Sequence, residues 1–392
     1  MSTNPPFVNL QNGFYNALSQ GLGFAPGSPF QLLQPSPPLV PNSNEALWNY
    51  FNNIPPFSLT QNYISSGGNQ FFSDYKGLIS ALVAPPNTFQ QDIGTDAYNS
   101  WIAYVTRLNP IPAPNQLPNT FLSWAMIFFP GVAQIGAQDL SAMLLDPISQ
   151  AGLALMPYFG ANAPNWSLGY NDLVTQLNQA PSRGFTLDSQ TMNSNVSNSW
   201  TSGSNSGFFG LWGGSSYTST QSSKFASGAV NLTAAFEHIL TFVANPGNWY
   251  TSAAMGNAFA NQSGPPWNPK SSINWQNTFG SNGNMQRFAV NLIVAERMFI
   301  TATSSATFDT ADRTTIQNNS GAGLWPFYST NSSSGTTTSC DFNSDGSITI
   351  TITSQPGVPI VIGCSVIPVA QFVGHSVEGE KKFLAMRAQA RP

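Results

Sequence analysis

The sequence predicts an α+β protein, with a helical N-terminal domain followed by an antiparallel, β-rich and sandwich-like C-terminal domain. Three observations support this fold class. Apolar residues recur at helical spacing between residues 43 and 160. From about residue 160 they instead alternate with polar residues, which is typical of strands with one buried face. The 392 residues, of which 41% are hydrophobic, supply enough apolar area for more than one core.

We divide the chain into four parts. Residues 1–42 are dense in proline, and "QLLQPSPPLVPNS" indicates an extended, polyproline-like arm. Residues 43–160 form the helical domain, and residues 161–375 form the β-rich domain. Residues 376–392 form a charged C-terminal tail.

The helical domain should contain four or five short helices. Ser43 is placed to cap a first helix over "NEALWNYFNNI", which stops at Pro55. Two more apolar helices are expected over residues 119–158, broken at Pro130 and near Pro147. Between them, two helices are indicated by apolar residues that share one face: Tyr75, Leu78, Ile79 and Leu82 in one, and Tyr98, Trp101, Ile102, Val105 and Leu108 in the other.

Two long alternating runs predict strands in the second half of the chain. Residues 230–242 place Val230, Phe236 and Phe242 on one parity and polar residues on the other. Residues 288–300 repeat this pattern, although a helix is the competing prediction there. Residues 189–223 carry no charge, and their central aromatic residues favour a hairpin over a flexible linker.

The low charge content limits the function classes. Charged residues make up 7% of the chain, against about 25% in an average soluble domain. Twelve basic residues form a poor phosphate-binding surface, so we exclude nucleic acid as a partner. A net charge of -4 gives weak self-repulsion and favours a homo-oligomer. The N-terminus shows no signal peptide, and an extracellular or cell-surface location reached by another route is favoured over a cytoplasmic one.

His238 and Glu296 are the only candidate catalytic pair. Each interrupts the apolar parity of one predicted long strand, so the two side chains could meet in the buried layer if the strands are neighbours. A buried imidazole and carboxylate could serve as an acid/base pair. The alternatives are a His bound to a backbone carbonyl and a bulge that turns Glu296 outward. No nucleotide, zinc-protease or nucleophile-elbow motif accompanies them, so enzymatic activity is disfavoured.

Four tryptophans are candidate ligand-binding residues. Trp249, Trp267, Trp275 and Trp325 all lie in segments rich in Gly, Pro and Asn. Such side chains could stack on a glycan, rest at a membrane surface or anchor a protein partner. The alternative is that they plug the ends of the core.

The stretch "SCDFNSDGSITITITSQPGVPIVIGC" contains a partial calcium loop. Asp341, Asn343 and Asp345 match the first ligand positions, but Ile352 stands where a bidentate Glu is required. Asp309 or Asp312 would have to supply the missing ligand. The simpler interpretation is a turn before a strand, so we expect no cofactor, with calcium as the alternative.

The same stretch holds both cysteines. "SQPGVP" is predicted to turn a hairpin that places Ile348 and Cys364 on one buried face. Cys340 reaches Cys364 only if the chain doubles back, because bridged Cα atoms lie within about 7 Å. The disulfide therefore stays open as an alternative to a buried thiol at Cys364.

We therefore expect a non-enzymatic structural or interaction protein that self-associates through uncharged, aromatic-rich surfaces. The first alternative is a membrane-active, toxin-like protein with a helical domain that rearranges. It rests on the charge-free segment from Phe121 to Gln138, which contains no apolar run of transmembrane length. The second alternative is a glycan-binding module that uses the four tryptophans.

Overall fold

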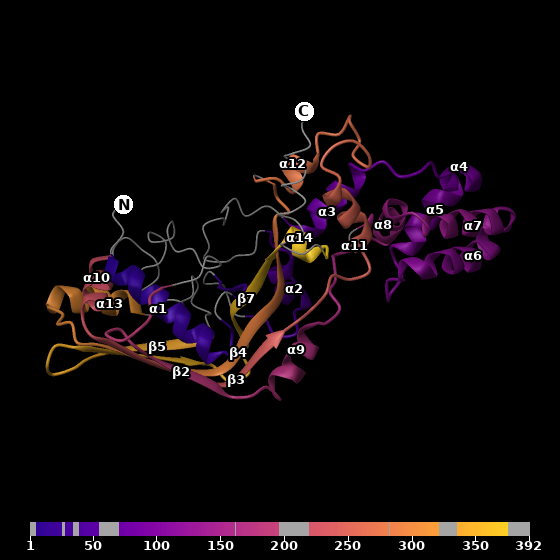
Figure 1. Ribbon diagram of the computed structural model, residues 1–392. Coiled ribbons are helices and arrows are strands. Elements are labelled where there is room, and N and C mark those ends of the chain that lie inside the picture. The colour runs from indigo at the N-terminus through magenta and orange to yellow at the C-terminus, as the bar shows by residue number, and fades with distance from the viewer. Residues whose placement is uncertain are drawn as a thin grey trace, which may run out of the picture.

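The computed structural model describes residues 5–25, 28–33, 39–54, 70–160, 162–195, 219–281, 283–320 and 335–374. Within them, helices occupy mainly the N-terminal half, and strands of one antiparallel sheet occupy mainly the C-terminal half (Figure 1). The α+β class is therefore confirmed. The layer packed on this sheet consists of helices and not of a second sheet.

The helices of the described residues form three groups. A helical lobe contains α4 (Phe89–Ile93), α5 (Thr95–Val105), α6 (Leu117–Phe128) and α7 (Ala133–Met143), with 3-10 turns at Pro114–Gln116 and Pro130–Val132. A central group contains α2 (Asn44–Asn52), α3 (Phe71–Ser80), α8 (Pro147–Leu155), the 3-10 turn Met156–Tyr158, α9 (Tyr170–Leu177), α11 (Ser252–Ala260), α12 (Trp275–Thr278) and α14 (Val369–Phe372). The third group contains α1 (Pro5–Gly21), α10 (Ser219–Ser227) and α13 (Thr310–Ser320).

The predicted helices of residues 43–108 are confirmed. Ser43 caps α2, where its Oγ accepts a hydrogen bond from the Ala46 N–H at 3.2 Å. Tyr75 and Leu78 are fully buried on one face of α3. The breaks at Pro130 and Pro147 are also present, but they divide residues 119–158 into three α-helices instead of two.

The sheet of the described residues has seven strands. These are β1 (Phe30–Leu32), β2 (Arg183–Asp188), β3 (Val230–Phe242), β4 (Arg287–Ser304), β5 (Thr336–Phe342), β6 (Ile348–Ser354) and β7 (Ile360–Pro368). Their order is β1-β7-β4-β3-β2, with β6 also on β4 and β5 on β6. Strands β3 and β4 confirm the two predicted alternating runs, and they pair along nearly their whole length.

Strands β6 and β7 lie end to end along the same edge of β4. Strand β6 pairs with residues 299–304, and β7 pairs with residues 287–295. The prediction that "SQPGVP" turns a hairpin is therefore wrong, because residues 355–359 only interrupt the pairing with β4. The hairpin in this region is instead formed by β5 and β6, which are joined by residues 343–347.

The sheet bends where β6 gives way to β7, and its strands change the core they face at this bend. Met298 and Ile300 of β4 contribute to core 2, which also contains Phe236, Ile348 and Ile350. Past the bend, residues of the other parity face core 2, including Ala295 of β4 and Ile239 of β3, while Leu292, Val294 and Phe242 face core 1. The curvature of β4 is visible in Figure 1. The predicted alternation is thus real, but its two ends serve different cores.

The three cores correspond to the three groups of helices. Core 1 lies between the central helices and the sheet beyond the bend, and contains Phe71, Tyr75 and Trp249. Core 2 lies between the sheet and the layer of α1, α10 and α13. Core 3 fills the helical lobe around Trp101 and Phe121.

The N-terminal segment corrects the prediction of an extended arm over residues 1–42. Residues 5–21 form α1, which packs on β2 and α10 and buries Phe14, Tyr15 and Leu18 in core 2. Burying this apolar face stabilises a helix despite the nearby prolines. The proline-rich residues 34–38 lie outside the described residues, as does the predicted C-terminal tail.

Strand β1 joins the N-terminal segment to the end of the sheet. It pairs with β7, with Phe30 opposite Ser365 and Leu32 opposite Gly363. Gly363 is required there, because a Cβ at this position would lie 2.4 Å from Cε2 of Phe30. The two ends of the described chain are therefore fixed to each other in one ladder.

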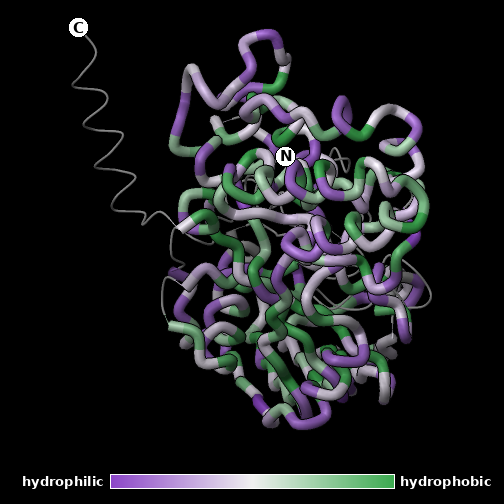
Figure 2. Tube along the Cα trace, turned by 90° about the vertical axis from the view of Figure 1, so that its right-hand side faces the viewer, coloured by the Kyte–Doolittle hydropathy of each residue, from purple (hydrophilic) through white to green (hydrophobic). Residues whose placement is uncertain are grey.

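Hydrophobic and hydrophilic residues are interleaved along the described helices, as Figure 2 shows from the side of the helical lobe. In the described part of the chain, no helix combines the length and the apolar character needed to cross a membrane.

Two carboxylates oppose each other in the helical lobe, and we expect their repulsion to destabilise it. Burial, and then the neighbouring Asp92 carboxylate of α4, raises the pKa of Asp139 on α7. A raised pKa means that stability is greatest when Asp139 is protonated and falls as pH rises through its folded pKa. Asp139→Asn should therefore raise the melting temperature at pH 7 by roughly 1–3 °C, a gain that disappears near pH 3.

Thermal melts between pH 3 and pH 7 measure this effect. Asp92→Asn is the matched control, because removing either carboxylate should relieve the same repulsion, so the double variant should gain little more than either single one. A lower melting temperature for Asp139→Asn at pH 7 would contradict the prediction.

Candidate functional site

The predicted pair His238 and Glu296 sits at the bend of the sheet. The two residues lie opposite each other in the β3–β4 ladder, as the sequence suggested. Their side chains nevertheless bind other partners. His238 Nδ1 donates to the Ala180 carbonyl at 3.1 Å, and Glu296 Oε1 accepts from the Gly357 N–H at 2.7 Å. No acid/base pair is assembled by these contacts. The His bound to a backbone carbonyl is the arrangement present, and Glu296 remains 7% exposed, so no bulge turns it outward.

These residues instead hold the bend. Residues 355–359 leave the ladder, so side chains supply hydrogen bonds that backbone partners supply elsewhere. Ser354 Oγ accepts from the Met298 N–H at 2.6 Å, beside the bond between Glu296 and Gly357. Arg297 adopts a φ of 51°, which is uncommon for a residue other than glycine, and its Nη1 lies 2.9 Å from Glu237 Oε1. This arrangement explains both residues by structure and not by catalysis.

The described candidate tryptophans belong to core 1 and its edge. Trp249 and Trp267 are buried and Trp275 is half-buried. Each indole N–H donates to a backbone carbonyl: Trp249 to Asn165 at 2.8 Å, Trp267 to Asn261 at 2.6 Å and Trp275 to Phe259 at 2.8 Å. They therefore do not form an exposed stacking surface. Trp325 lies outside the described residues.

The Asp-rich loop closes the β5–β6 hairpin with its own hydrogen bonds. Asp345 Oδ1 accepts from the Ser347 hydroxyl at 2.6 Å and from its N–H at 3.0 Å, and these bonds lower the pKa of Asp345. Asn343 Nδ2 donates to Ser347 Oγ at 2.8 Å. The turn before a strand is confirmed. Within the described residues, no three His, Cys, Asp or Glu side chains are grouped to hold a metal ion.

The two cysteines are free and lie in different parts of the sheet. Cys340 sits on β5 opposite Ile350 and packs against core 2. Cys364 sits on β7 opposite Leu292 and is buried in core 1. The hairpin and shared face predicted for Ile348 and Cys364 are thus replaced by two separate environments, and burial raises the pKa of the Cys364 thiol.

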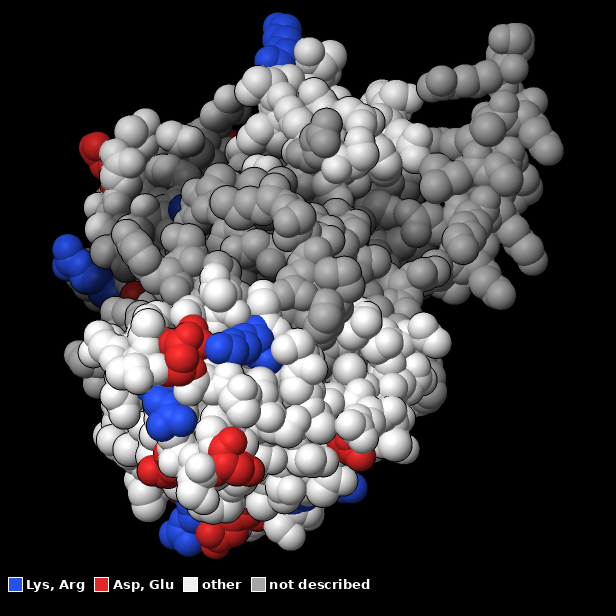
Figure 3. Space-filling model, turned by 90° about the vertical axis from the view of Figure 1, so that its left-hand side faces the viewer, with Lys and Arg blue, Asp and Glu red and all other residues white. Residues whose placement is uncertain are grey.

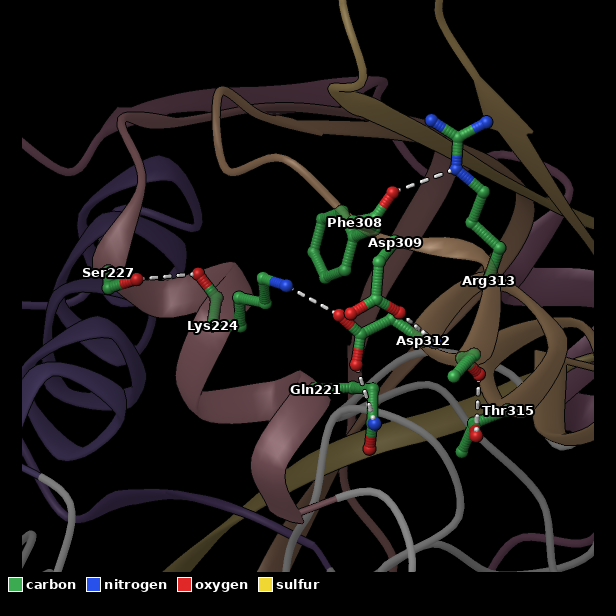
Figure 4. A network of polar contacts seen from close by, with 9 residues as sticks. Gln221, Lys224, Ser227, Phe308, Asp309, Asp312, Arg313 and Thr315 are labelled. Atoms are coloured by element: carbon green, nitrogen blue, oxygen red, sulfur yellow. Dashed lines mark hydrogen bonds and ion pairs between the residues drawn. The ribbon is translucent and has the colours of Figure 1, made fainter.

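A polar network joins α10 to α13 (Figure 4). Asp312 of α13 accepts from Lys224 Nζ and, at 2.9 Å, from Gln221 Nε2, both on α10. Lys224 also lies 5.6 Å from the centre of the Phe308 ring. The hydrogen bond from Lys224 is the main cause of a lowered pKa at Asp312. Its only printed partners are protein groups, so the network has a structural explanation as the joint between two helices that cover core 2.

One face of the sheet before the bend is not covered. We call it the open face, and it comprises 15 residues, three from each of five strands, whose register follows from the strand pairing. Its first row is Asp341, Thr349, Thr303, Asn231 and Asp188. Its middle row is Ser339, Thr351, Thr301, Thr233 and Thr186. Its last row is Thr337, Thr353, Phe299, Ala235 and Gly184.

None of these 15 residues is buried, whereas the opposite face of the same strands packs into core 2. Phe299 is 52% exposed, and threonine occupies eight of the positions. The only charges are Asp188 and Asp341, at two corners of the first row. The ion pair of Glu237 and Arg297 borders the other end. The sequence predicted polar faces for these strands, but not that the threonines align or that the face stays uncovered.

Charged side chains are sparse on the end of the molecule that carries α10 and α13. Figure 3 looks onto this end and shows them dotted over a surface that is mostly uncharged. The open face continues this character on the sheet itself, with hydroxyls in place of ions.

A second exposed surface lies where α6 turns into α7. We call it the apolar tip, and it comprises Met126, Ile127 and Phe128 at the end of α6 and Ile135 in the first turn of α7, which are 60%, 74%, 61% and 39% exposed. Trp124 supports it from below, with its ring centre 5.9 Å from that of Phe128. This tip belongs to the charge-free segment that the sequence associates with membranes.

Searches for similar proteins return nothing: no protein-family model, no curated protein and no solved structure matches the chain.

Proposed function

We propose that this chain is a non-enzymatic structural or interaction protein that self-associates, and that the open face is its principal contact surface. The observation that carries the proposal is a sheet face of 15 residues with an uncharged centre and charges only at its border. Interfaces in general have this distribution, because charged residues are depleted at their centre and tolerated at their rim.

Phe299 gives this face an apolar anchor. Large aromatic side chains supply much of the binding energy at interfaces when water is excluded around them. Phe299 is half exposed although its neighbours along β4, Met298 and Ile300, are buried in core 2. Its exposure therefore does not follow from a poorly folded strand, and covering it would remove apolar area from water.

Light scattering over a concentration series tests the proposal. We expect the purified protein to form a defined oligomer whose mass changes little with salt, because screening acts on charges and the face has almost none. A protein that stays monomeric at high concentration would remove the basis of this function.

A membrane-active, toxin-like function is the second candidate, and the apolar tip is the observation that favours it. A contiguous exposed apolar patch marks an interaction site more often than scattered single residues do. The tip projects from the end of a helix hairpin, and fluid lipid accepts a convex protrusion more readily than a folded partner does. In this candidate the helical lobe docks on the membrane and then rearranges.

Vesicle co-sedimentation and dye release separate this candidate from the first. The double variant Ile127→Asp and Phe128→Asp should reduce vesicle binding at least about tenfold, since each buried side chain contributes roughly 1.5–3 kcal/mol. Ser123→Asp, at an exposed position of the same helix, is the matched control. Wild-type protein that neither binds vesicles nor releases dye would exclude the candidate.

A further inference from the structure

We infer that the open face binds the open face of a second copy of this chain, in a pair whose two-fold axis lies in the interface and runs across the strands. This inference rests on the proposed self-association and adds the partner and its orientation.

The size of the face suits a small specific dimer. Five strands spaced at about 4.8 Å span roughly 24 Å, and three positions along each strand, two residues apart, span roughly 20 Å. One face therefore covers about 480 Å², and two faces together cover close to 1,000 Å². This is the lower limit for a specific protein interface, so the pair should be stable but reversible.

The chemistry of the face is complementary to itself. A threonine hydroxyl both donates and accepts a hydrogen bond, so two identical threonine surfaces can satisfy each other, which two surfaces of one charge cannot. The middle row, which contains Thr186, Thr233, Thr301 and Thr351, is entirely hydroxyl-bearing. Thr301 occupies the middle strand and the middle row, so a two-fold axis through the centre places it opposite its own copy.

The two acidic corners select the orientation. Asp188 and Asp341 lie at opposite ends of the same row. An axis parallel to the strands would place Asp188 of one copy over Asp341 of the other, at both corners, and like charges in contact are unfavourable. An axis across the strands instead places each Asp over the last row of the other copy, with Asp341 over Thr337.

The same orientation provides a place for the exposed aromatic ring. It puts Phe299 of each copy over Thr303 of the other, with β4 over β4. Two twisted sheets that pack in an aligned manner, at about -30°, keep each strand over its equivalent. The two Phe299 rings then lie on either side of the axis and do not compete for one position.

The first experiment tests the surface. Thr301→Lys should weaken association at least about 100-fold, because two ammonium groups would be buried against each other at the axis. Thr175→Lys, the same substitution at an exposed position of α9, should leave association unchanged. Circular dichroism on both variants checks that the fold is retained.

The second experiment tests the orientation by cross-linking with a short bifunctional maleimide, in a Cys340→Ser background. Thr301→Cys should cross-link to itself. A mixture of the Thr303→Cys and Phe299→Cys proteins should form the cross-linked heterodimer, while Thr303→Cys alone should not cross-link. Self-cross-linking of Thr303→Cys would instead support the axis parallel to the strands and overturn the inferred orientation.

The outcomes separate this inference from the proposed function. A wild-type oligomer that survives Thr301→Lys and gives no cross-link at Thr301→Cys would overturn the inference and leave self-association in place. A wild-type protein that is monomeric at all concentrations would overturn both.

Discussion

Replacing Trp249 by alanine is expected to destabilise the folded protein by about 3–5 kcal/mol, the usual cost of deleting a large buried aromatic side chain. Trp249 is fully buried in core 1, with ring centres of Phe71 and Phe72 each 5.2 Å from its own. The substitution would leave a cavity among rings that cannot collapse to fill it. It would also leave the Asn165 carbonyl without the indole N–H that donates to it at 2.8 Å.

Urea unfolding followed by circular dichroism measures this loss. Trp249→Phe is the matched control, because it retains most of the ring volume and removes mainly the hydrogen bond to Asn165, so its loss should be closer to about 1–2 kcal/mol. An unchanged unfolding midpoint for Trp249→Ala would contradict the structural role. If that stable variant also lost binding on a glycan array, the ligand-binding role predicted from the sequence would be restored.

Replacing Glu296 by alanine is expected to cost about 1–3 kcal/mol and to loosen the bend of the sheet. The carboxylate accepts the Gly357 N–H at 2.7 Å where residues 355–359 leave the ladder, and a buried acceptor removed there is not replaced by water at no cost. Hydrogen exchange should accelerate at Gly357 and at Met298, whose N–H donates to Ser354 Oγ.

Two control variants bracket this effect. Glu296→Gln keeps an oxygen acceptor and should lose less stability than Glu296→Ala. Glu237→Ala breaks an ion pair with Arg297 in which both side chains are about half exposed, so it should cost no more than about 0.5 kcal/mol. An equal cost for Glu237→Ala and Glu296→Ala would show that the buried hydrogen bond does not hold the bend.

The parts of the fold predicted correctly are those with long, regular periodicity. Strands β3 and β4 bury alternate residues over many positions, and this pattern depends only on the local chain. Helices α2, α3 and α5 follow in the same way from apolar residues at helical spacing. In both cases the local pattern and the tertiary packing agree.

The parts that were wrong depend on distant partners. Pro356-Gly357 has the composition of a hairpin turn, but residues on either side of it pair with β4 and not with each other. The N-terminal segment was interpreted by its prolines, while helix α1 is stabilised by the core 2 surface that it covers. In each case tertiary contacts overrode a local signal.

The candidate site was only partly accessible from the sequence. The opposition of His238 and Glu296 followed from matching parity in two strands, but the hydrogen bonds that occupy these side chains come from Ala180 and Gly357, in other elements. The tryptophans were placed in loops without any indication of which way their rings point. The open face needed the register of five strands, which no single segment contains.

The pairing of β1 with β7 has a consequence for how the protein is made. Phe30 lies opposite Ser365, so a strand near the start of translation waits for a partner that leaves the ribosome almost last. Until then the fully buried Phe30 and Leu32 have no sheet to join. The nascent chain should therefore depend on chaperones that hold its N-terminal segment, and premature termination before β7 should yield aggregates instead of a soluble fragment.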